Sequence, residues 1–263
     1  MTTQSSRESQ RRRPRSGQNR ARGAPPSDGL VRLYGFHPVV EALANPRRVV
    51  RRLLATENAV ARLMAERPDL TVAPSLVGPH EISRLVEADA VHQGLYLETE
   101  PLESLRIGDL PSDALVLALD QITDPHNVGA ITRTAAAFGV TAIMTTARHS
   151  PGATGILAKA ASGGLEHVAA LTVRNLAEAL IQLGSQGFSR IGLDSEGTTE
   201  FRTLAPRRPA VIVLGAEGKG LRQRTRDCCD VVARLDMPGA VKSLNVSNAA
   251  AIALYGLSAL PPG

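Results

Sequence analysis

From residue 114 to the C-terminus, short apolar runs alternate with segments of helical pattern. The runs and the segments between them predict strands at 114–119, 141–146, 189–193, 210–214 and 231–235, helices at 127–138, 153–162 and 176–186, and a long last helix from Ser243. Strands that alternate with helices form a mostly parallel sheet that is covered on both faces. This part of the chain is therefore predicted to be an α/β domain.

A second, smaller α/β pattern occupies residues 30–100. Pro38 suits the first turn of a helix, and Asn45 ends that helix because a residue before proline disfavours helical backbone. The remaining pattern predicts strands at 49–56, 70–74 and 94–98 and helices at 59–66 and 79–86. Residues 101–113, with their prolines, glycine and charges, predict a linker to the domain at 114–263. We find no internal repeat.

The first 29 residues carry the whole net charge of +5, because they contain seven arginines against Glu8 and Asp28 while the rest of the chain is balanced. An arginine-rich arm with Ser, Gln, Gly and Pro has the composition of a disordered segment. It either contacts RNA phosphates or only aids solubility. The balanced body argues against nucleic-acid binding over the whole surface.

The chain contains two cysteines, Cys228 and Cys229, which are adjacent. Adjacent cysteines are poorly placed for an ordinary disulfide or a zinc site, so we expect a reducing environment and no metal. No apolar run reaches the roughly 20 residues that span a bilayer, and the basic N-terminus lacks the apolar stretch of a signal peptide. We therefore expect a cytoplasmic protein with no membrane partner.

Polar residues gather in the segment 120–133, where an apolar strand run ends. Asp124, followed by proline, is a helix-start signal because its side chain can cap free N–H groups. Gly129 lies one turn before Arg133, so the guanidinium is expected on a helix face whose preceding turn has no side-chain bulk. A guanidinium there can bind a phosphate or carboxylate through two hydrogen bonds. A surface Arg133 and a merely capping Asn127 remain the alternative interpretation of this segment.

The segment 213–220 also follows a strand and contains three glycines and Glu217. It is not a P-loop, because Lys219 is followed by glycine, and its glycine spacing is not that of a Rossmann fingerprint. Glycines after a strand let a ligand approach the backbone closely. A tight turn is the alternative.

A third segment places Ser243, Asn245, Ser247 and Asn248 at the start of the long Ala-rich helix. One such group is enough to cap the helix, so the others favour contact with a ligand. Ligands of open α/β sheets bind beyond the carboxyl ends of the strands. The three segments together therefore predict one site.

The three segments resemble the three motifs of the SpoU or TrmH branch of the SPOUT RNA 2′-O-methyltransferases: Asn-x-Gly-x-x-x-Arg at 127–133, Leu-Gly-x-Glu-Gly at 214–218 and Ser-Leu-Asn-Val-Ser at 243–247. Residues 34–37 (Tyr-Gly-Phe-His) and 91–94 (Val-His-Gln-Gly) resemble the small L30e-like domain of members that methylate a guanosine of 23S ribosomal RNA. The resemblance implies an L30e-like RNA-recognition domain followed by a SPOUT domain whose mostly parallel sheet carries a trefoil knot.

The same resemblance implies S-adenosyl-L-methionine as the cofactor, bent within the knot and bound by main-chain and apolar contacts. The implied contact residues are Leu214, Gly215, Leu235, Met237 and Leu244. At 236–238 this chain has Asp-Met-Pro, whereas the family more often has an apolar residue followed by Pro-Met.

The implied reaction is in-line methyl transfer to a ribose 2′-hydroxyl, a weak nucleophile that needs a proton acceptor or an electrostatic substitute. The family gives this role to Arg133, acting with an RNA phosphate and from either subunit of a homodimer. Because a guanidinium stays protonated in almost any protein, we expect Arg133 to orient the nucleotide and stabilise alkoxide charge. Asn127 and Glu217 are expected to position the nucleotide and the loop, and Ser243 and Asn245 to complete the pocket floor.

Two alternatives retain RNA as the partner. A tRNA 2′-O-methyltransferase of the same family is disfavoured by the domain at 30–100, since close tRNA-modifying relatives often have short helical extensions instead. A non-catalytic RNA-binding protein of ribosome assembly is disfavoured by the polar residues in all three motifs. A generic nucleotide-binding enzyme is disfavoured because the chain has neither a P-loop nor a Rossmann glycine fingerprint.

Overall fold

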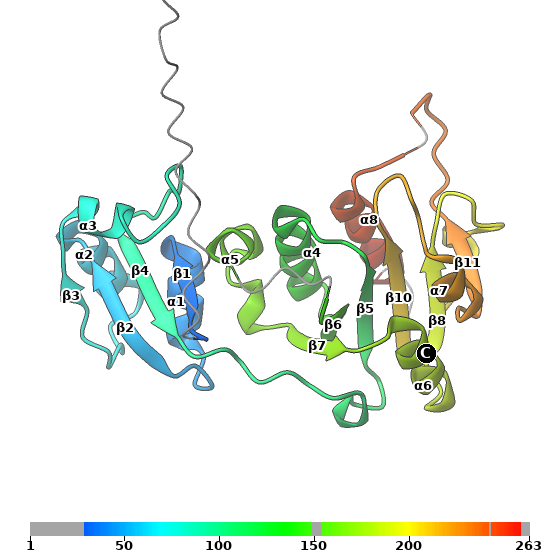
Figure 1. The fold of residues 1–263 in the computed structure, drawn as a ribbon, viewed down its shortest axis with the longest axis horizontal. Helices are drawn as coiled ribbons and strands as arrows, with labels where there is room; N and C mark the ends of the chain where they lie inside the picture. The colour runs from blue at the N-terminus through cyan, green and yellow to red at the C-terminus, as the bar shows by residue number, and fades with distance from the viewer. Residues whose placement is uncertain (1–28, 149–153, 242, 259–263) are drawn as a thin grey trace, which may run out of the picture.

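The computed structural model describes residues 29–148, 154–241 and 243–258. They form two sheets, and the connection between the sheets runs beneath them in Figure 1. The arm predicted at 1–29 lies outside the described residues except for Gly29. No helix in the described part of the chain is both long enough and apolar enough to cross a bilayer.

The smaller sheet has the strand order β1-β4-β2-β3, in which β4 pairs antiparallel with β1 and β2, and β2 pairs parallel with β3. Its elements are β1 (Val31–Tyr34), α1 (Phe36–Ala44), β2 (Val50–Ala55), α2 (Glu57–Glu66), β3 (Ser75–Leu76), α3 (Pro79–Ser83) and β4 (Leu95–Thr99). Gln93 Oε1 accepts a hydrogen bond from the backbone N–H of Phe36 (3.0 Å). The two short segments that resemble the L30e-like domain are therefore in contact at the start of α1.

The larger sheet has the order β7-β6-β5-β10-β8-β11-β9, and every neighbouring pair is parallel. Its strands are β5 (Leu115–Asp120), β6 (Ala142–Thr146), β7 (Ala169–Val173), β8 (Ser189–Leu193), β9 (Thr199–Glu200), β10 (Ala210–Gly215) and β11 (Val231–Arg234). The helices are α4 (Pro125–Ala137), α5 (Gly155–Ala161), α6 (Leu176–Ser185), α7 (Gln223–Asp227) and α8 (Val246–Ser258), with short 3-10 turns η1 (Ile107–Asp109), η2 (Gly164–Glu166) and η3 (Phe201–Thr203). The predicted α/β fold with a mostly parallel sheet is confirmed.

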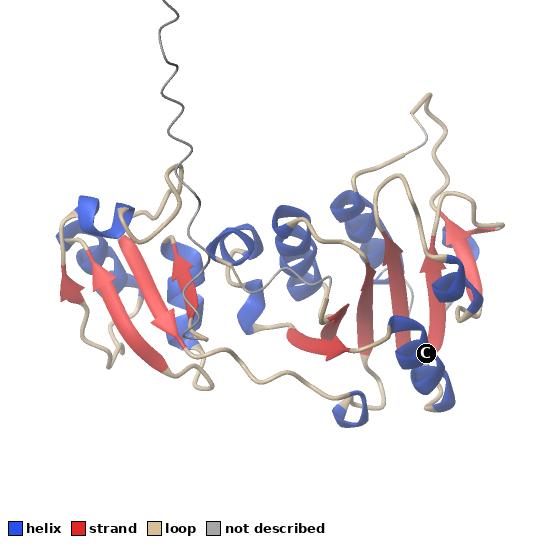
Figure 2. Ribbon diagram, in the orientation of Figure 1, coloured by secondary structure: helices blue, strands red, loops and turns tan. Residues whose placement is uncertain are grey.

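Helices cover both faces of the larger sheet (Figure 2). Leu115, Leu117 and Leu119 of β5 share an apolar core with α4 and α8. Val116 and Ala118 share a second core with α6. Because successive side chains of a strand point to opposite faces, a central strand covered on both sides has a continuous apolar sequence, which is why these strands are visible in the sequence.

The sequence prediction fails for short or peripheral elements. It does not include β1, β7, β9 or α7, and the strand predicted at 70–74 is wrong, since residues 75–76 form β3 instead. β7 is an edge strand in which only Leu171 is buried, so it lacks a continuous apolar run. The helix predicted at 79–86 ends at Ser83, and the last helix begins at Val246, not at Ser243.

The two sheets meet in a seam formed by residues 45–48 on one side and α5 with η2 on the other. Arg48 and Glu166 form an ion pair at 2.8 Å in which each side chain is only 3% exposed. Asn45 Nδ2 donates a hydrogen bond to Glu166 Oε2 at 2.7 Å. At the start of α5, Gly155 lies so close to the ring of Tyr34 that a side chain at 155 would collide with it.

Candidate functional site

A cavity of about 260 Å³ lies at the carboxyl ends of β8, β10 and β11. We call it the knot-edge pocket, after the trefoil knot that the family resemblance implies. Its walls come from the loop 215–220 after β10, from residues 193–196 after β8 and from the start of α8. The five residues predicted to contact the cofactor all line it: Leu214, Gly215, Leu235, Met237 and Leu244. The structure therefore brings the second and third segments together around one space.

Two of the predicted catalytic residues, Glu217 and Ser243, also line the knot-edge pocket. Glu217 Oε1 accepts a hydrogen bond from the backbone N–H of Val246, the first residue of α8, at 3.1 Å. A carboxylate at a helix N-terminus is favoured by the free N–H groups and the helix dipole. Glu217 therefore connects the loop after β10 to α8.

Asn127 and Asn245 connect the first segment to the third. Asn245 Nδ2 donates to Asn127 Oδ1 at 2.9 Å, and Asn245 Oδ1 accepts from the backbone N–H of Ser247 at 2.8 Å. Asn245 is thus the capping residue of α8, and its amide group joins the beginnings of α4 and α8. Neither asparagine is part of the pocket wall.

Arg133 is not brought to the pocket of its own chain. It lies six residues beyond Asn127 in α4, about 9 Å further along the helix axis at 1.5 Å per residue. Its side chain is exposed and makes no hydrogen bond or ion pair with the described residues. No described residue pairs with the guanidinium, so it can bind a group from outside this chain.

The interpretation of Gly129 as cleared space for Arg133 is wrong. A Cβ atom at 129 would lie 2.5 Å from the Cβ of Ala160 and 2.6 Å from the carbonyl oxygen of Leu157. Gly129 therefore lets α4 and α5 pack closely, and its role is structural. Gly215 has a similar role, because a side chain there would collide with the backbone of Gly220 as the loop 215–220 folds back.

Asp194, which the sequence analysis missed, anchors this loop from the end of β8. Asp194 Oδ2 accepts the backbone N–H of Leu221 at 2.9 Å and pairs with Arg226 at 2.8 Å. Burial alone would raise the pKa of Asp194, but the backbone N–H groups of Leu221 and Glu196, together with Arg226, lower it overall. A polar residue where the strand run 189–193 stops is the same signal that identified the other three segments.

Asp194→Asn should destabilise the protein in a pH-dependent way. Because the folded-state pKa of Asp194 is lowered, its carboxylate stabilises the fold above the ordinary Asp pKa of about 3.9, and this stabilisation is lost as the pH falls through the lowered value. The free energy of unfolding should therefore differ most between variant and wild type near neutral pH, and the difference should shrink in acid. Urea unfolding near neutral pH and in acid measures this difference in the free energy of unfolding. The exposed Asp236→Asn serves as the control. A difference independent of pH would contradict this role.

A second buried carboxylate joins the first segment to the loop. Asp120, at the end of β5, accepts hydrogen bonds from the backbone N–H (3.0 Å) and the Nε (2.7 Å) of Arg222.

Asp236, where this chain departs from the family pattern, is half exposed and lies 3.7 Å from Arg202. It is not in the pocket wall, although its neighbours Leu235 and Met237 are. The acidic residue therefore pairs with Arg202 outside the pocket wall.

The two cysteines directly follow α7. Cys228 and Cys229 are both free, and burial raises the pKa of Cys229 to about 12, so its nucleophilic thiolate form is suppressed. In the same part of the chain, no group of three or more His, Cys, Asp or Glu residues is placed to bind a metal ion.

The sequence matches known families over both sheets. The profile of the SpoU rRNA Methylase family matches residues 114–255, and the profile for RNA 2′-O ribose methyltransferase substrate binding matches residues 32–105. The chain belongs to the SpoU rRNA methylase family. The 23S rRNA (guanosine-2′-O-)-methyltransferase RlmB of Pseudomonas aeruginosa is 38% identical, over 85% of this chain and 94% of the relative.

The 23S rRNA (guanosine-2′-O-)-methyltransferase RlmB of Pseudomonas putida is 35% identical, over 86% of this chain and 95% of the relative. Among solved structures, the SpoU methyltransferase AviRb of Streptomyces viridochromogenes, in complex with AdoMet, superposes with a TM-score of 0.74 at 24% identity. The superposition covers 88% of this chain and 89% of AviRb. The SpoU fold is thus shared along nearly the whole described chain.

Proposed function

We propose that this SpoU family protein transfers a methyl group to the ribose 2′-hydroxyl of a guanosine in 23S ribosomal RNA. The observation that carries the proposal is the similarity to relatives named 23S rRNA (guanosine-2′-O-)-methyltransferase, which extends over 94% and 95% of their lengths. The similarity includes the substrate-binding region at 32–105. The site of action would be the cytoplasm, where bacterial ribosomal RNA is made.

S-Adenosyl-L-methionine, in this proposal, supplies the electrophilic methyl group on its sulfonium sulfur. The knot-edge pocket fits such a ligand, because Leu214, Leu235 and Leu244 offer apolar surface and the backbone of 215–220 offers polar groups. The wall carries a formal excess of one negative charge near a cationic ligand, because it contains three carboxylates (Asp194, Glu196 and Glu217) against two cations (Lys219 and Arg226).

The residues around this pocket would act mainly by positioning. Arg133 orients an RNA phosphate and stabilises the negative charge that develops on the 2′-oxygen. Because Arg133 lies outside the pocket wall of its own chain, we assign it to the pocket of a partner subunit. Asn127 and Glu217 position the target nucleotide and the loop, and Ser243 contributes to the pocket floor. Asn245, which was predicted for the floor, lies outside the pocket wall and acts through its cap on α8 and its hydrogen bond to Asn127.

We propose the domain boundaries 30–100 for RNA recognition, 101–113 for the linker and 114–263 for methyl transfer. The matched profile regions, 32–105 and 114–255, support them. The trefoil knot is proposed from family membership alone. The basic arm at 1–29 is proposed as an additional phosphate contact on the basis of its seven arginines.

A homodimer is expected in solution. The outward face of α8 exposes Ile252 (48%) and Tyr255 (68%), and the Tyr255 ring packs edge-on against Phe138 beside α4. A partner subunit on this face would bury both side chains. Sedimentation at low micromolar concentration should show a dimer, and Ile252→Glu should shift it towards monomer. A monomeric wild type would contradict the expectation.

The proposed reaction is tested by incubation with S-adenosyl-L-methionine carrying a labelled methyl group and an unmodified 23S ribosomal RNA transcript. A 2′-O-methyl group blocks alkaline cleavage of the adjacent phosphodiester, so an alkaline ladder locates the modified nucleotide. We expect label at a single guanosine. Label in a parallel tRNA pool, but not in the 23S transcript, would support the tRNA alternative. RNA binding without affinity for S-adenosyl-L-methionine would support the non-catalytic alternative.

A further inference from the structure

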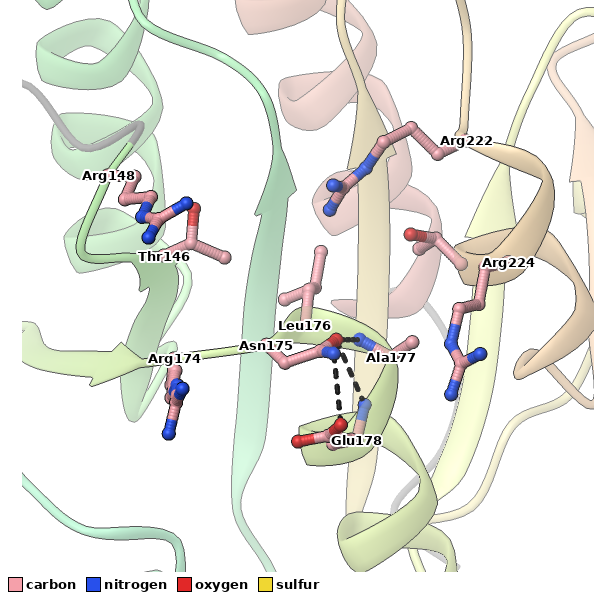
Figure 3. Close-up of a pocket in the computed structure, with 10 residues that line it drawn as sticks. Thr146, Arg148, Arg174, Asn175, Leu176, Ala177, Glu178, Arg222 and Arg224 are labelled. Carbon is pink, nitrogen blue, oxygen red and sulfur yellow. Dashed lines mark hydrogen bonds between the residues drawn. The ribbon is translucent and has the colours of Figure 1, made fainter.

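A second cavity, of about 670 Å³, lies in front of β5 and β10 (Figure 3). Four arginines line it: Arg148 after β6, Arg174 after β7, and Arg222 and Arg224 at α7. In Figure 3 the side chains of Arg148 and Arg222 extend towards each other from opposite sides. We propose that this arginine cleft binds backbone phosphates of the RNA next to the methylated nucleotide. The inference rests on the proposed function and assigns it a binding surface.

The positive charge in the arginine cleft is largely uncompensated. Arg148, Arg174 and Arg224 have no hydrogen-bond or ion-pair partner among the described residues. Arg222 is anchored through its Nε to the buried Asp120, which fixes the direction in which its terminal amino groups point. The planar fork of a guanidinium matches the oxygens of a phosphate group. Four such forks around one space favour a polyanion.

The carboxylate in the wall is already engaged. Of the described residues that line the cleft, Glu178 alone is acidic, and its Oε1 accepts a hydrogen bond from Asn175 Nδ2 at 3.1 Å. Asn175 Oδ1 in turn accepts the backbone N–H groups of Ala177 and Glu178 at the start of α6. The N-terminus of α6 is therefore capped by its own side chain, and the arginines are the groups left to bind an anion.

The cleft suits an RNA backbone better than a base. Its apolar lining consists of Leu176 and Ala177, and none of the described residues in its wall is aromatic. Stacking platforms for bases are normally aromatic, whereas phosphate contacts come from arginine, hydroxyl and amide groups. The cleft is therefore built to fix the path of the RNA, without reading its sequence.

The position of the arginine cleft links it to the knot-edge pocket. Arg222 and Arg224 line the cleft. Arg226, one helical turn after Arg222, lines the knot-edge pocket. The same segment is anchored at its start by the hydrogen bond from Leu221 to Asp194. α7 therefore separates the two spaces, and RNA phosphates in the cleft would lie beside the loop 215–220.

The test compares the double variant Arg174→Ala/Arg224→Ala with Arg207→Ala/Arg208→Ala, which removes the same charge. Arg207 and Arg208 are exposed and precede β10, at the opposite end of the strands. RNA affinity is measured at several salt concentrations with an unmodified 23S transcript, and cofactor affinity is measured separately. The cleft variant should bind RNA about 10- to 100-fold more weakly and with a salt slope smaller by about two, because two phosphate contacts are lost. Its affinity for S-adenosyl-L-methionine should match the wild type.

The possible outcomes separate the two proposals. Equal losses in the two double variants would mean that only total charge matters, and unchanged RNA affinity in the cleft variant would also overturn the cleft proposal. In both cases methylation of 23S RNA by the wild type would leave the proposed function intact. A wild type that neither binds nor methylates the transcript would overturn both.

Discussion

Arg133→Ala should slow methyl transfer by about 10² to 10⁴ in single-turnover assays with saturating S-adenosyl-L-methionine. The exposed guanidinium makes no hydrogen bond or ion pair with the described residues, so its removal should leave the fold and the cofactor affinity nearly unchanged. Arg133→Lys should be almost as slow, because an ammonium group cannot reproduce a two-pronged phosphate contact. A near-wild-type rate for Arg133→Ala would remove this residue from the mechanism.

Mixed dimers show which subunit uses Arg133. Leu244→Arg adds a cation to the wall of the knot-edge pocket, beside Lys219 and Arg226, and should weaken binding of the cationic cofactor. If Arg133 serves the partner's pocket, a dimer of one Arg133→Ala chain and one Leu244→Arg chain contains one complete site and regains activity. If Arg133 serves its own chain, the mixed dimer contains no complete site and stays inactive. A large loss of cofactor affinity in Arg133→Ala alone would instead assign this residue to the cofactor.

Glu166→Ala should be among the most destabilising single substitutions in the seam, with a loss of about 3–5 kcal/mol in the free energy of unfolding. The substitution leaves the Arg48 guanidinium buried without its carboxylate, and both side chains of the pair are only 3% exposed. Arg48→Met/Glu166→Leu should recover most of the loss, since apolar residues can replace a buried ion pair. Urea unfolding measures all three proteins.

The exposed pair Arg106–Asp109 provides the matched control, because its side chains are 85% and 41% exposed. Breaking an exposed pair changes stability little, so Arg106→Ala should unfold near the wild-type denaturant concentration. Similar unfolding of Glu166→Ala and Arg106→Ala would show that the seam contributes no special stability.

The sequence predicts features that neighbouring residues encode and misses those that depend on contacts between residues far apart in the chain. A buried parallel strand and the polar residue that ends it are encoded within a few neighbouring positions, so β5, β10 and the three motif segments are visible directly. The hydrogen bond between Asn127 and Asn245 joins residues far apart in the chain, and no local pattern encodes such a pair. Gly129 was misinterpreted for the same reason, because its neighbour is Ala160 on another helix.

Asp194 shows the other limit. Its position after a strand was visible, but a single acidic residue followed by serine and glutamate has the composition of an ordinary surface turn. The contacts that give it a role, to Leu221 and Arg226, come from a loop that sequence spacing does not place beside it. The four arginines of the cleft were likewise dispersed over three connections, so only the fold gathers them.

The contact between Gly155 and the ring of Tyr34 limits how the two halves of this protein can be exchanged. Gly155 begins a helix beside the methylase sheet, yet the atoms that exclude a side chain there belong to the substrate-binding sheet. A chimera that takes residues 30–100 from a relative must therefore carry at position 34 a side chain that packs against glycine at 155. Otherwise, residues 34 and 155 must be exchanged together. The residues at positions 34 and 155 therefore depend on each other, although they belong to different domains.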